Sequence, residues 1–595
     1  MLAALPGQEA DTEARWTGAS VAFGRRGRVL RDDRTGRVPR FDAASGFSIT
    51  ATVRLDGRAS LCDALELSRR DRAGLSDSAL LLRSYARWGR ACPDHLLGDF
   101  AFALWDAKRD VLFCARDHVG TRPFYYALTG ERFVFASDIA AVLAATGVSG
   151  DLDEAAVATR LTYGVRSLGA RTCYRAVRRL PPGHALCVER GAVRLHRWWR
   201  PEEVPPLPPA SDDAVAEQCL AILTEAVRDR LWGAGHVGVH LSGGLDSSGI
   251  AVLAARELRQ AGRAAPPAFT WYPAPGPGLR GVAEAGVYDR IESVRRQEDL
   301  QLLCRPLEPD DVIASLRGDG TRGASSGTLE EMVLRTAAGE GVEVLLSGLG
   351  GDEGISFNGR GYYPQLLRSG RVRRLWREVR ERHRRPFAAL LFEAALPLVS
   401  RRTAKVARRL RRGAWPFRKN VAFIHPGFAR RVRPLPAGPG LPRAGVRATQ
   451  LRLLQSGRHA SHMEQWAVSG ARHGIEYRYP LLDRRVLEFA LGLPPEQYRR
   501  GRWSRWLMRR ALDPILPSEV CWNPSKRESF ESARGAVAEA MLKVRGMIEE
   551  RDELPLRACY LNLPRLLEEL DPERWRASGS RRQKPVLNAL FFLDF

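Results

Sequence analysis

The pattern of hydrophobic and polar positions changes about a third of the way along the chain. Before that point, short stretches rich in aromatic and β-branched residues are typical of strands: FSITATVRL (Phe47–Leu55), VLFCAR (Val111–Arg116) and RFVFAS (Arg132–Ser137). Turn dipeptides such as Asp56-Gly57 and Thr129-Gly130 separate such stretches. We therefore expect an antiparallel, sheet-based domain over residues 1–200.

The change falls at PEEVPPLPPA, residues 201–210, which reads as a stiff proline-rich connector. Ser211 then offers a helix N-cap, with Asp212 and Asp213 in the first turn. The apolar residues that follow recur at helical spacing, namely Val215, Cys219, Ile222, Leu223 and Val227. A second domain is thus expected over residues 211–595.

Strand patterns alternate with helical patterns in this second domain. The predicted elements are strand His236–Leu241, helix Ser248–Gln260, strand Pro267–Tyr272, helix Thr328–Ala338 and strand Glu343–Leu346. Such alternation predicts a parallel sheet with ligands at the carboxyl ends of its strands.

Composition indicates which cellular compartment and which kinds of site to expect. The nine cysteines stand singly without a CxxC pair, no run of 18 apolar residues occurs, and the start lacks a signal-peptide pattern. These features favour a cytoplasmic protein with no membrane span and no cysteine-bound zinc.

The net charge of +25 comes almost wholly from arginine. Only six of the 93 basic residues are lysine: Lys108, Lys405, Lys419, Lys526, Lys543 and Lys584. Solvated arginine faces account for this charge, although a basic surface can also bind an acidic peptide or nucleic acid. Residues 368–433 are the most basic stretch and read as an exposed helical insertion or as a docking face for an acidic partner.

Two glycine-rich loops carry the candidate chemistry. LSGGLDSS (Leu241–Ser248) lies between a predicted strand and a helix, where adjacent glycines, hydroxyls and free helix N–H groups suit a phosphate. It lacks the GK[ST] ending of a Walker A loop, and its carboxylate Asp246 suits Mg²⁺. LSGLGGDE (Leu346–Glu353) follows another strand, so Asp246 and Asp352 should face each other across the strand ends.

Together these loops resemble the pyrophosphatase-loop synthetase domain of the asparagine synthetase family. Three later segments agree: Gly474–Pro494 (GIEYRYPLLDRRVLEFALGLP), Arg505–Leu512 (RWLMRRAL) and Asn523–Phe530 (NPSKRESF). The resemblance implies an α/β protein in which an antiparallel, glutaminase-like domain of the N-terminal-nucleophile type precedes a parallel-sheet synthetase domain.

The resemblance also implies adenylation chemistry. A substrate carboxylate attacks the α-phosphate of ATP, pyrophosphate leaves, and an amine then displaces AMP. The cofactors implied are ATP and Mg²⁺, with Asp246 and Asp352 as metal ligands and Ser347, Gly348 and the backbone near Trp271 around the nucleoside. Lys526 would lie over the α-phosphate and stabilise developing charge. The implied pyrophosphate-binding residues are Leu241, Ser242, Gly243, Gly244, Asp246 and Ser247.

More weakly, Gly98–Tyr126 and Arg179–His184 resemble the glutaminase domain of the same family. Glutamine hydrolysis there requires a cysteine directly after the initiator methionine, but this sequence has Leu2, which cannot act as a nucleophile. Cys62 and Cys92 lie away from the start and do not replace it. We expect a domain without glutaminase activity, unless the start codon is wrongly assigned.

Family members without this cysteine include β-lactam synthetases, carbapenam synthetases and lasso-peptide cyclases. The β-lactam group has a tyrosine in the second loop, where this chain has Leu349, and Gly354–Arg371 (GISFNGRGYYPQLLRSGR) resembles lasso-peptide cyclases instead. We therefore expect a macrolactam synthetase that joins the terminal amine of a precursor core peptide to an Asp or Glu side chain. A leader peptidase and a leader-recognition protein would be its partners.

Two alternative functions remain open. One is a small-molecule amide or β-lactam synthetase whose amine comes from a source other than glutamine. The other is a non-catalytic basic scaffold. Membranes and nucleic acid are not expected as partners.

Overall fold

The structure is a computed structural model, and every structural statement below concerns the residues it describes. These are residues 1–5, 12–27, 38–43, 45–72, 74–130, 132–163, 168–272, 283–316, 328–398, 423–435, 445–524, 533–551, 556–577 and 580–593.

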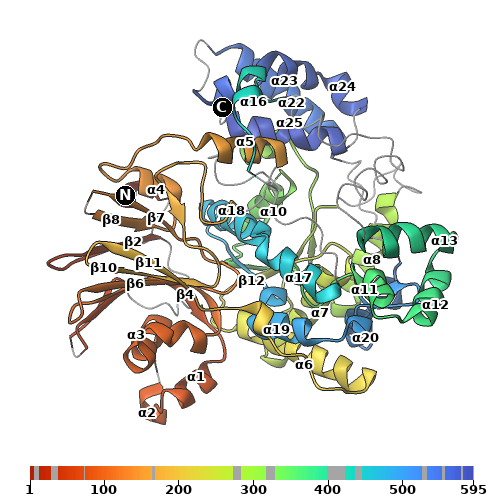
Figure 1. The fold of residues 1–595 in the computed structure, drawn as a ribbon, viewed down its shortest axis with the longest axis horizontal. Coiled ribbons are helices and arrows are strands. Elements are labelled where there is room, and N and C mark those ends of the chain that lie inside the picture. Colours follow the sequence, from red (N-terminus) through yellow and green to blue (C-terminus); the bar gives the residue numbers. More distant parts are fainter. Residues whose placement is uncertain are drawn as a thin grey trace.

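Antiparallel sheets occupy the amino-terminal third, at the left of Figure 1. One sheet has six strands in the order β11-β10-β6-β5-β4-β3, a second has three in the order β8-β7-β9, and β1 and β2 form a hairpin. The strands are β1 Thr12–Thr17, β2 Ala22–Gly27, β3 Arg40–Asp42, β4 Phe47–Leu55, β5 Gly98–Asp106, β6 Val111–Arg116, β7 Tyr125–Thr129, β8 Arg132–Ala136, β9 Arg178–Arg179, β10 His184–Glu189 and β11 Ala192–Arg197.

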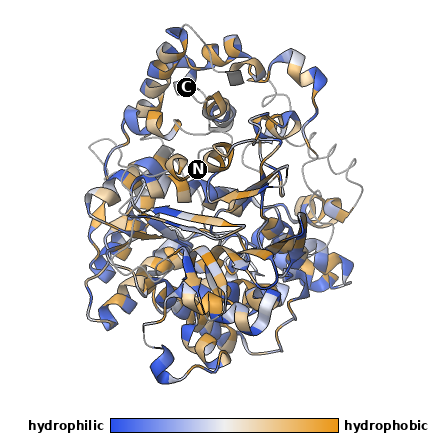
Figure 2. Cartoon of the chain, turned by 90° about the vertical axis from the view of Figure 1, so that its left-hand side faces the viewer, coloured by the Kyte–Doolittle hydropathy of each residue, from blue (hydrophilic) through white to orange (hydrophobic). Residues whose placement is uncertain are grey.

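The predicted antiparallel character of this part is confirmed. The predicted bounds of β4 and β6 agree with the structure, and β8 ends one residue earlier than predicted. Apart from two positions, β4 is buried along its whole length. Helices α1 Arg58–Ala64, α2 Arg69–Arg72 and α3 Asp77–Trp88 lie beneath the six-stranded sheet in Figure 1. Figure 2, which faces this part, shows hydrophobic and hydrophilic residues interleaved along its strands.

A five-stranded parallel sheet forms the centre of the second part, as predicted. Its strands are β12 Val237–His240, β13 Ala268–Phe269, β14 Leu302–Leu303, β15 Val344–Leu346 and β16 Glu476–Arg478. Their order is β14-β13-β12-β15-β16, so the chain first adds strands on one side of β12 and then returns to add β15 on the other. This reversal opens a crevice at the carboxyl ends of β12 and β15, where open α/β sheets bind their ligands.

Local sequence signals explain the helices next to this sheet. The hydroxyl of Ser211 accepts a hydrogen bond from the Ala214 N–H (3.2 Å) and so caps α6 (Asp212–Leu231), as predicted. Helix α7 (Leu245–Gln260) begins three residues before the predicted start, because Gly244 is its N-cap and Leu245, Asp246 and Ser247 form its first turn.

The other helices surround the sheet or form a cap of carboxy-terminal helices at the top of Figure 1. They are α4 Ile139–Leu143, α5 Glu154–Tyr163, α8 Ala283–Glu298, α9 Pro309–Leu316, α10 Thr328–Gly339, α11 Tyr362–Arg368, α12 Val372–Arg382, α13 Pro386–Ala389, α16 Pro426–Arg431, α17 Val446–Gln455, α18 Arg458–Arg472, α19 Arg484–Gly492, α20 Trp506–Leu512, α21 Ser518–Cys521, α22 Arg534–Glu549, α23 Leu563–Glu569, α24 Pro572–Ala577 and α25 Ser580–Leu593. A short β-hairpin, β17 Arg499–Arg500 with β18 Trp503–Ser504, precedes α20.

The described part of the basic stretch 368–433 is mostly helical and includes α12, α13 and α16. Residues 399–422 of that stretch lie outside the described residues. Within the described part of the chain, no helix combines the length and the apolar character needed to cross a membrane.

The two parts share one interior. A single hydrophobic cluster contains Phe100 and Trp199 from the antiparallel part together with Phe269, Leu345 and Trp466 around the parallel sheet. Buried ion pairs cross the same boundary: Glu464 of α18 lies 2.9 Å from both Arg116 and Arg179. The amino-terminal part is therefore packed into the fold rather than tethered to it.

Candidate active site

The first glycine loop joins β12 to α7 at the crevice. Ser242 and Ser247 brace it, since their hydroxyl oxygens are 2.8 Å apart and the Ser242 N–H donates to Ser247 Oγ (3.1 Å). Gly243 has φ +66°, and a Cβ there would stand 2.9 Å from the Val287 carbonyl oxygen, so glycine is required on both counts. The resulting turn presents the first N–H groups of α7 to the cavity, which is an arrangement that binds anions.

The second glycine loop follows β15 and touches the first. A Cβ on Gly348 would stand 2.8 Å from the backbone nitrogen of Ser247, and a Cβ on Gly351 would stand 2.8 Å from the carboxylate of Asp246. Side chains at these two positions would push the loops apart. The glycines therefore bring Asp352, the next residue, close to Asp246.

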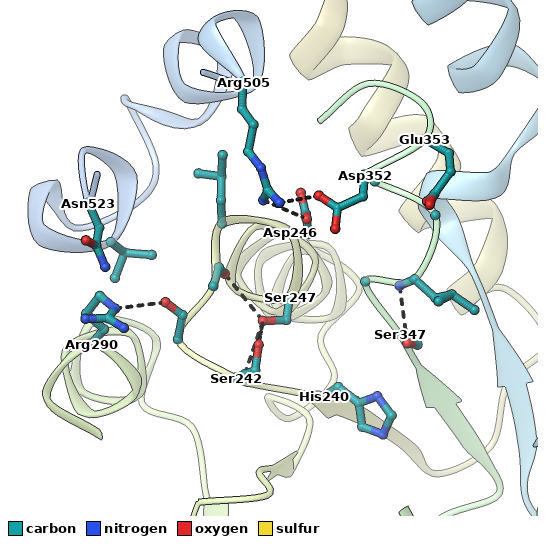
Figure 3. Close-up of a pocket in the computed structure, with 18 of the residues that line it drawn as sticks. His240, Ser242, Asp246, Ser247, Arg290, Ser347, Asp352, Glu353, Arg505 and Asn523 are labelled. Carbon is teal, nitrogen blue, oxygen red and sulfur yellow. Dashed lines mark hydrogen bonds and ion pairs between the residues drawn. The ribbon is translucent and has the colours of Figure 1, made fainter. Parts of the chain in front are cut away.

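A single arginine bridges the two acidic residues. Arg505 Nη1 lies 3.1 Å from Asp246 Oδ2, and Arg505 Nη2 pairs with Asp352, as Figure 3 shows. Arg505 is the residue before α20 and has φ +60°, a conformation that non-glycine residues rarely adopt. Its side chain is only 10% exposed, so the two ion pairs and the burial fix a locally strained backbone.

Both loops line a cavity of about 380 Å³. Its wall includes both glycine loops, their acidic side chains and the guanidinium groups of Arg290, Arg505 and Arg509. Arg290 also braces the first loop, since its Nε donates to the Gly243 carbonyl oxygen (3.2 Å). The sequence-predicted residues on the cavity wall are Ser242, Gly243, Gly244, Asp246, Ser247, Trp271, Ser347, Gly348 and Asp352.

The wall also contains two tryptophans, Trp271 and Trp466, and three histidines. His240 Nε2 lies 3.0 Å from the buried carboxylate of Glu330, which also accepts hydrogen bonds from the Trp271 indole (3.1 Å) and the Tyr477 hydroxyl. Burial alone would raise the pKa of Glu330, but His240 and these donors outweigh it and lower that pKa. Glu330 thereby stays charged and fixes the orientation of Trp271 and His240.

The acidic pair suits a divalent cation. Asp246 and Asp352 supply hard oxygen donors, the glycines leave room beside Asp246, and one guanidinium already bridges both carboxylates. A cation that bound there would take over the positive charge that Arg505 now provides.

One predicted site residue does not lie on the cavity wall, and another lies outside the described residues. Leu241 is fully buried, and its backbone N–H donates to the Phe269 carbonyl oxygen (2.8 Å), so its side chain supports the loop from the core. Lys526 lies outside the described residues, although Asn523 and Pro524 just before that segment line the cavity.

Several cavity residues were not predicted from the sequence: His240, Arg290, Glu353, Arg458, His459, His462, Trp466, Arg505 and Arg509. A polar residue at the carboxyl end of a buried parallel strand was a usable signal for His240. The segment Arg505–Leu512 was identified only as a resemblance to the synthetase family, and its residues alone did not indicate that Arg505 pairs with Asp246 and Asp352.

The amino-terminal part presents no accessible thiol among its described residues. Cys62, Cys92, Cys114, Cys173 and Cys187 are all buried. Burial raises the thiol pKa of Cys92, Cys114 and Cys187, whereas a nucleophilic cysteine requires an accessible thiolate. The described cysteines of this part are therefore unsuited to glutamine hydrolysis.

Comparison with known proteins gives two family matches. Residues 218–590 match the family model described as "Asparagine synthase", and residues 1–199 match the one described as "Glutamine amidotransferase domain".

Individual proteins are also similar to this chain. "Asparagine synthetase [glutamine-hydrolyzing] 3" of Bacillus subtilis is 32% identical over 42% of this chain and 41% of its own length. "Amidase chyE" of Penicillium rubens is 34% identical over 31% of this chain and 28% of its own. "Probable asparagine synthetase [glutamine-hydrolyzing]" of Schizosaccharomyces pombe is 26% identical over 77% of this chain and 68% of its own. The chain thus spans less than half the length of the first two.

Proposed function

The chain belongs to the asparagine synthase family, and on that premise we propose that it is an ATP-dependent amide synthetase that releases AMP and pyrophosphate. The observation that supports this most directly is the pair of glycine loops at the reversal point of the parallel sheet, with two carboxylates bridged over one cavity. A nucleoside triphosphate that binds there needs N–H groups that bind anions, and it needs the negative charge of the two carboxylates to be neutralised. The start of α7 and Arg505 offer these two features.

In this proposal each loop has a task. The first loop and the start of α7 bind the β- and γ-phosphates, which leave as pyrophosphate. Ser347, Gly348 and Trp271 lie beside the nucleoside. Mg²⁺ at Asp246 and Asp352 would neutralise charge on the phosphates. Arg290 and Arg509 add fixed positive charge on the wall and stabilise the charge that builds up as the α-phosphate is attacked.

The amine does not come from glutamine in this proposal. The described thiols of the amino-terminal part are buried, so ammonia must come from solution or the amine must belong to the substrate. The barrier to amide formation falls most when the amine and the carboxylate belong to the same molecule, because a site that holds both ends replaces a bimolecular encounter.

We propose that the substrate is a precursor core peptide closed into a lasso-type macrolactam. The support is the resemblance carried by residues 354–371 and the presence of Leu349 in the second loop. In the structure the aromatic residues of the 354–371 segment pack in the core: Phe357, Tyr362 and Tyr363 are at most 1% exposed, whereas Arg360 and residues 368–371 are exposed. It therefore supports kinship rather than a substrate contact.

The test is product analysis. The protein is incubated with ATP, Mg²⁺ and the core peptide encoded beside its gene, after removal of the leader. We expect AMP, pyrophosphate and a peptide lighter by one water with a ring that resists fragmentation. ADP and phosphate as products would contradict the adenylation proposal, and an amidated linear peptide would contradict the macrolactam.

A second candidate is amide formation on a small acid, which the names of the asparagine synthetase relatives favour. Aspartate with ammonium in place of the peptide decides between the two. Asparagine formation without lactam formation would replace the peptide proposal.

A further inference from the structure

The cavity holds more proton acceptors than adenylation requires. Six described residues on its wall have a carboxylate or an imidazole: Asp246, Asp352, Glu353, His240, His459 and His462. Adenylation of a carboxylate transfers no proton, whereas the amine that attacks the adenylate must lose one. One of these groups can serve that second step.

Four of these six residues are poor candidates for the base, because they are paired with other groups or are weak bases. Asp246 and Asp352 are bridged by Arg505 and are the proposed ligands of Mg²⁺. His240 is buried against Glu330 beneath Trp271. His462 packs edge-on against Trp466, with ring centroids 4.7 Å apart, and burial lowers its pKa to about 4, so it is a weak base at neutral pH.

The other two form a pair. Nε2 of His459, in the first turn of α18, lies 3.2 Å from Oε2 of Glu353. Glu353 directly follows Asp352, but Figure 3 shows that the two carboxylates lie apart: Asp352 points toward Arg505, and Glu353 lies farther from Arg505, on the other side of Asp352. The second loop thus directs one carboxylate to Arg505 and the other to His459.

We propose that His459 is the general base of amide formation and that Glu353 positions it. This inference rests on the proposed function and assigns the proton-accepting residue to the same site. With the Nε2 proton facing Glu353, the Nδ1 lone pair of His459 is left to accept a proton. The carboxylate also stabilises the imidazolium that results.

Amide formation makes one bond to the acyl carbon and breaks another. The amine nitrogen attacks the acyl carbon, the C–N bond forms, and the bond from carbon to the AMP oxygen breaks with its electron pair leaving on AMP. The proton that the nitrogen loses goes to His459 Nδ1. Protonation of His459 is compensated locally, because Glu353 lies beside it and the side chains of both are largely buried (9% and 14% exposed).

The experiment separates the two half-reactions in the full-length protein. Pyrophosphate exchange into ATP, measured with N-acetylated core peptide, reports adenylation alone, because that peptide has no terminal amine. Lactam formation from the unmodified core peptide reports both steps. Hydroxylamine, whose nitrogen is unprotonated at neutral pH, traps the adenylate as a hydroxamate and relieves the need for a base.

We expect His459→Gln to lower lactam formation by roughly 10²–10⁴-fold, the range of general bases. Pyrophosphate exchange and hydroxamate formation should stay within about twofold, on the same reasoning. Glu353→Gln, of equal size, should give the same split with a smaller loss. The matched control is His473→Gln, which breaks a comparable histidine–glutamate pair (His473 Nε2 to Glu331 Oε1, 2.9 Å) at the other end of α18, off the cavity wall.

Three outcomes would overturn the inference: normal lactam formation in either variant, parallel loss of exchange and lactam in a folded variant, or the same split in His473→Gln. Glu353→Gln provides the test if His459→Gln does not fold, as judged by circular dichroism. Absence of exchange in the unmodified protein would instead overturn the proposed function itself.

Discussion

Arg230 on α6 ties the two parts of the molecule together, and its removal gives the sharpest stability prediction. Its guanidinium is 1% exposed and lies 2.7 Å from Asp483, 3.4 Å from Asp56 and 3.9 Å from Asp99. Asp56 and Asp99 belong to the antiparallel part, and Asp483 precedes α19. Burial would raise the pKa of Asp483, but Arg230 and Arg485 outweigh burial and hold that pKa well below its usual range.

The size of the effect follows from which partners remain. Removing one member of a buried ion pair destabilises a protein by roughly 3–5 kcal/mol. Here Asp56 and Asp99 keep Arg54, and Asp483 keeps Arg485 at 2.8 Å. We therefore expect Arg230→Met to lower the free energy of unfolding at neutral pH by about 3 kcal/mol, the lower end of that range.

The pH dependence of the stability loss tests whether Arg230→Met acts through the carboxyl of Asp56. Burial raises the pKa of Asp56 even though Arg54 and Arg230 lower it, so loss of Arg230 raises it further. A carboxyl with a raised folded-state pKa destabilises the fold at high pH, and this cost disappears as acidification protonates it. The difference between parent and variant should accordingly shrink as the pH falls below neutral.

Urea unfolding followed by tryptophan fluorescence measures this, with the first transition compared between proteins. Arg295→Met is the control, because Arg295 is 33% exposed in its pair with Glu292 and should change stability by less than about 1 kcal/mol. A loss below about 1 kcal/mol for Arg230→Met at neutral pH, or a loss that does not vary with pH, would refute the reasoning.

Two further predictions concern the active site, and a third concerns the amino-terminal part. Asp246→Asn and Asp352→Asn should each lower pyrophosphate exchange by roughly 10²-fold or more without changing the circular dichroism, because each removes charge at a strand end and no core packing. Lys526→Ala should lower turnover by roughly 10²–10³-fold, and Lys526→Arg should not restore it, since a planar fork replaces a point charge. Glutamine should yield no glutamate above background with or without ATP, because the described thiols of the amino-terminal part are buried; ATP-stimulated glutamate release would contradict this.

Local sequence determined a good deal of this protein. The bounds of β4 and β6, the Ser211 cap and both glycine loops depend on residues close together in the chain. Strand alternation, an N-cap and a glycine turn are properties of short segments, and the alternation of strands with helices implies a parallel sheet with its ligands at one edge. The facing of Asp246 and Asp352 followed from that rule alone.

Only the tertiary structure decided what surrounds those loops. Arg505 reaches Asp246 across 259 positions of sequence, His459 meets Glu353 from a different helix, and Arg230 joins carboxylates of both parts. In a chain with 93 basic residues, nothing in the sequence separates a solvated arginine from one that pairs with two carboxylates of distant segments. The physical reason is that burial and pairing are properties of packed surfaces between distant segments, whereas a sequence pattern reports only on neighbours within a turn or a strand.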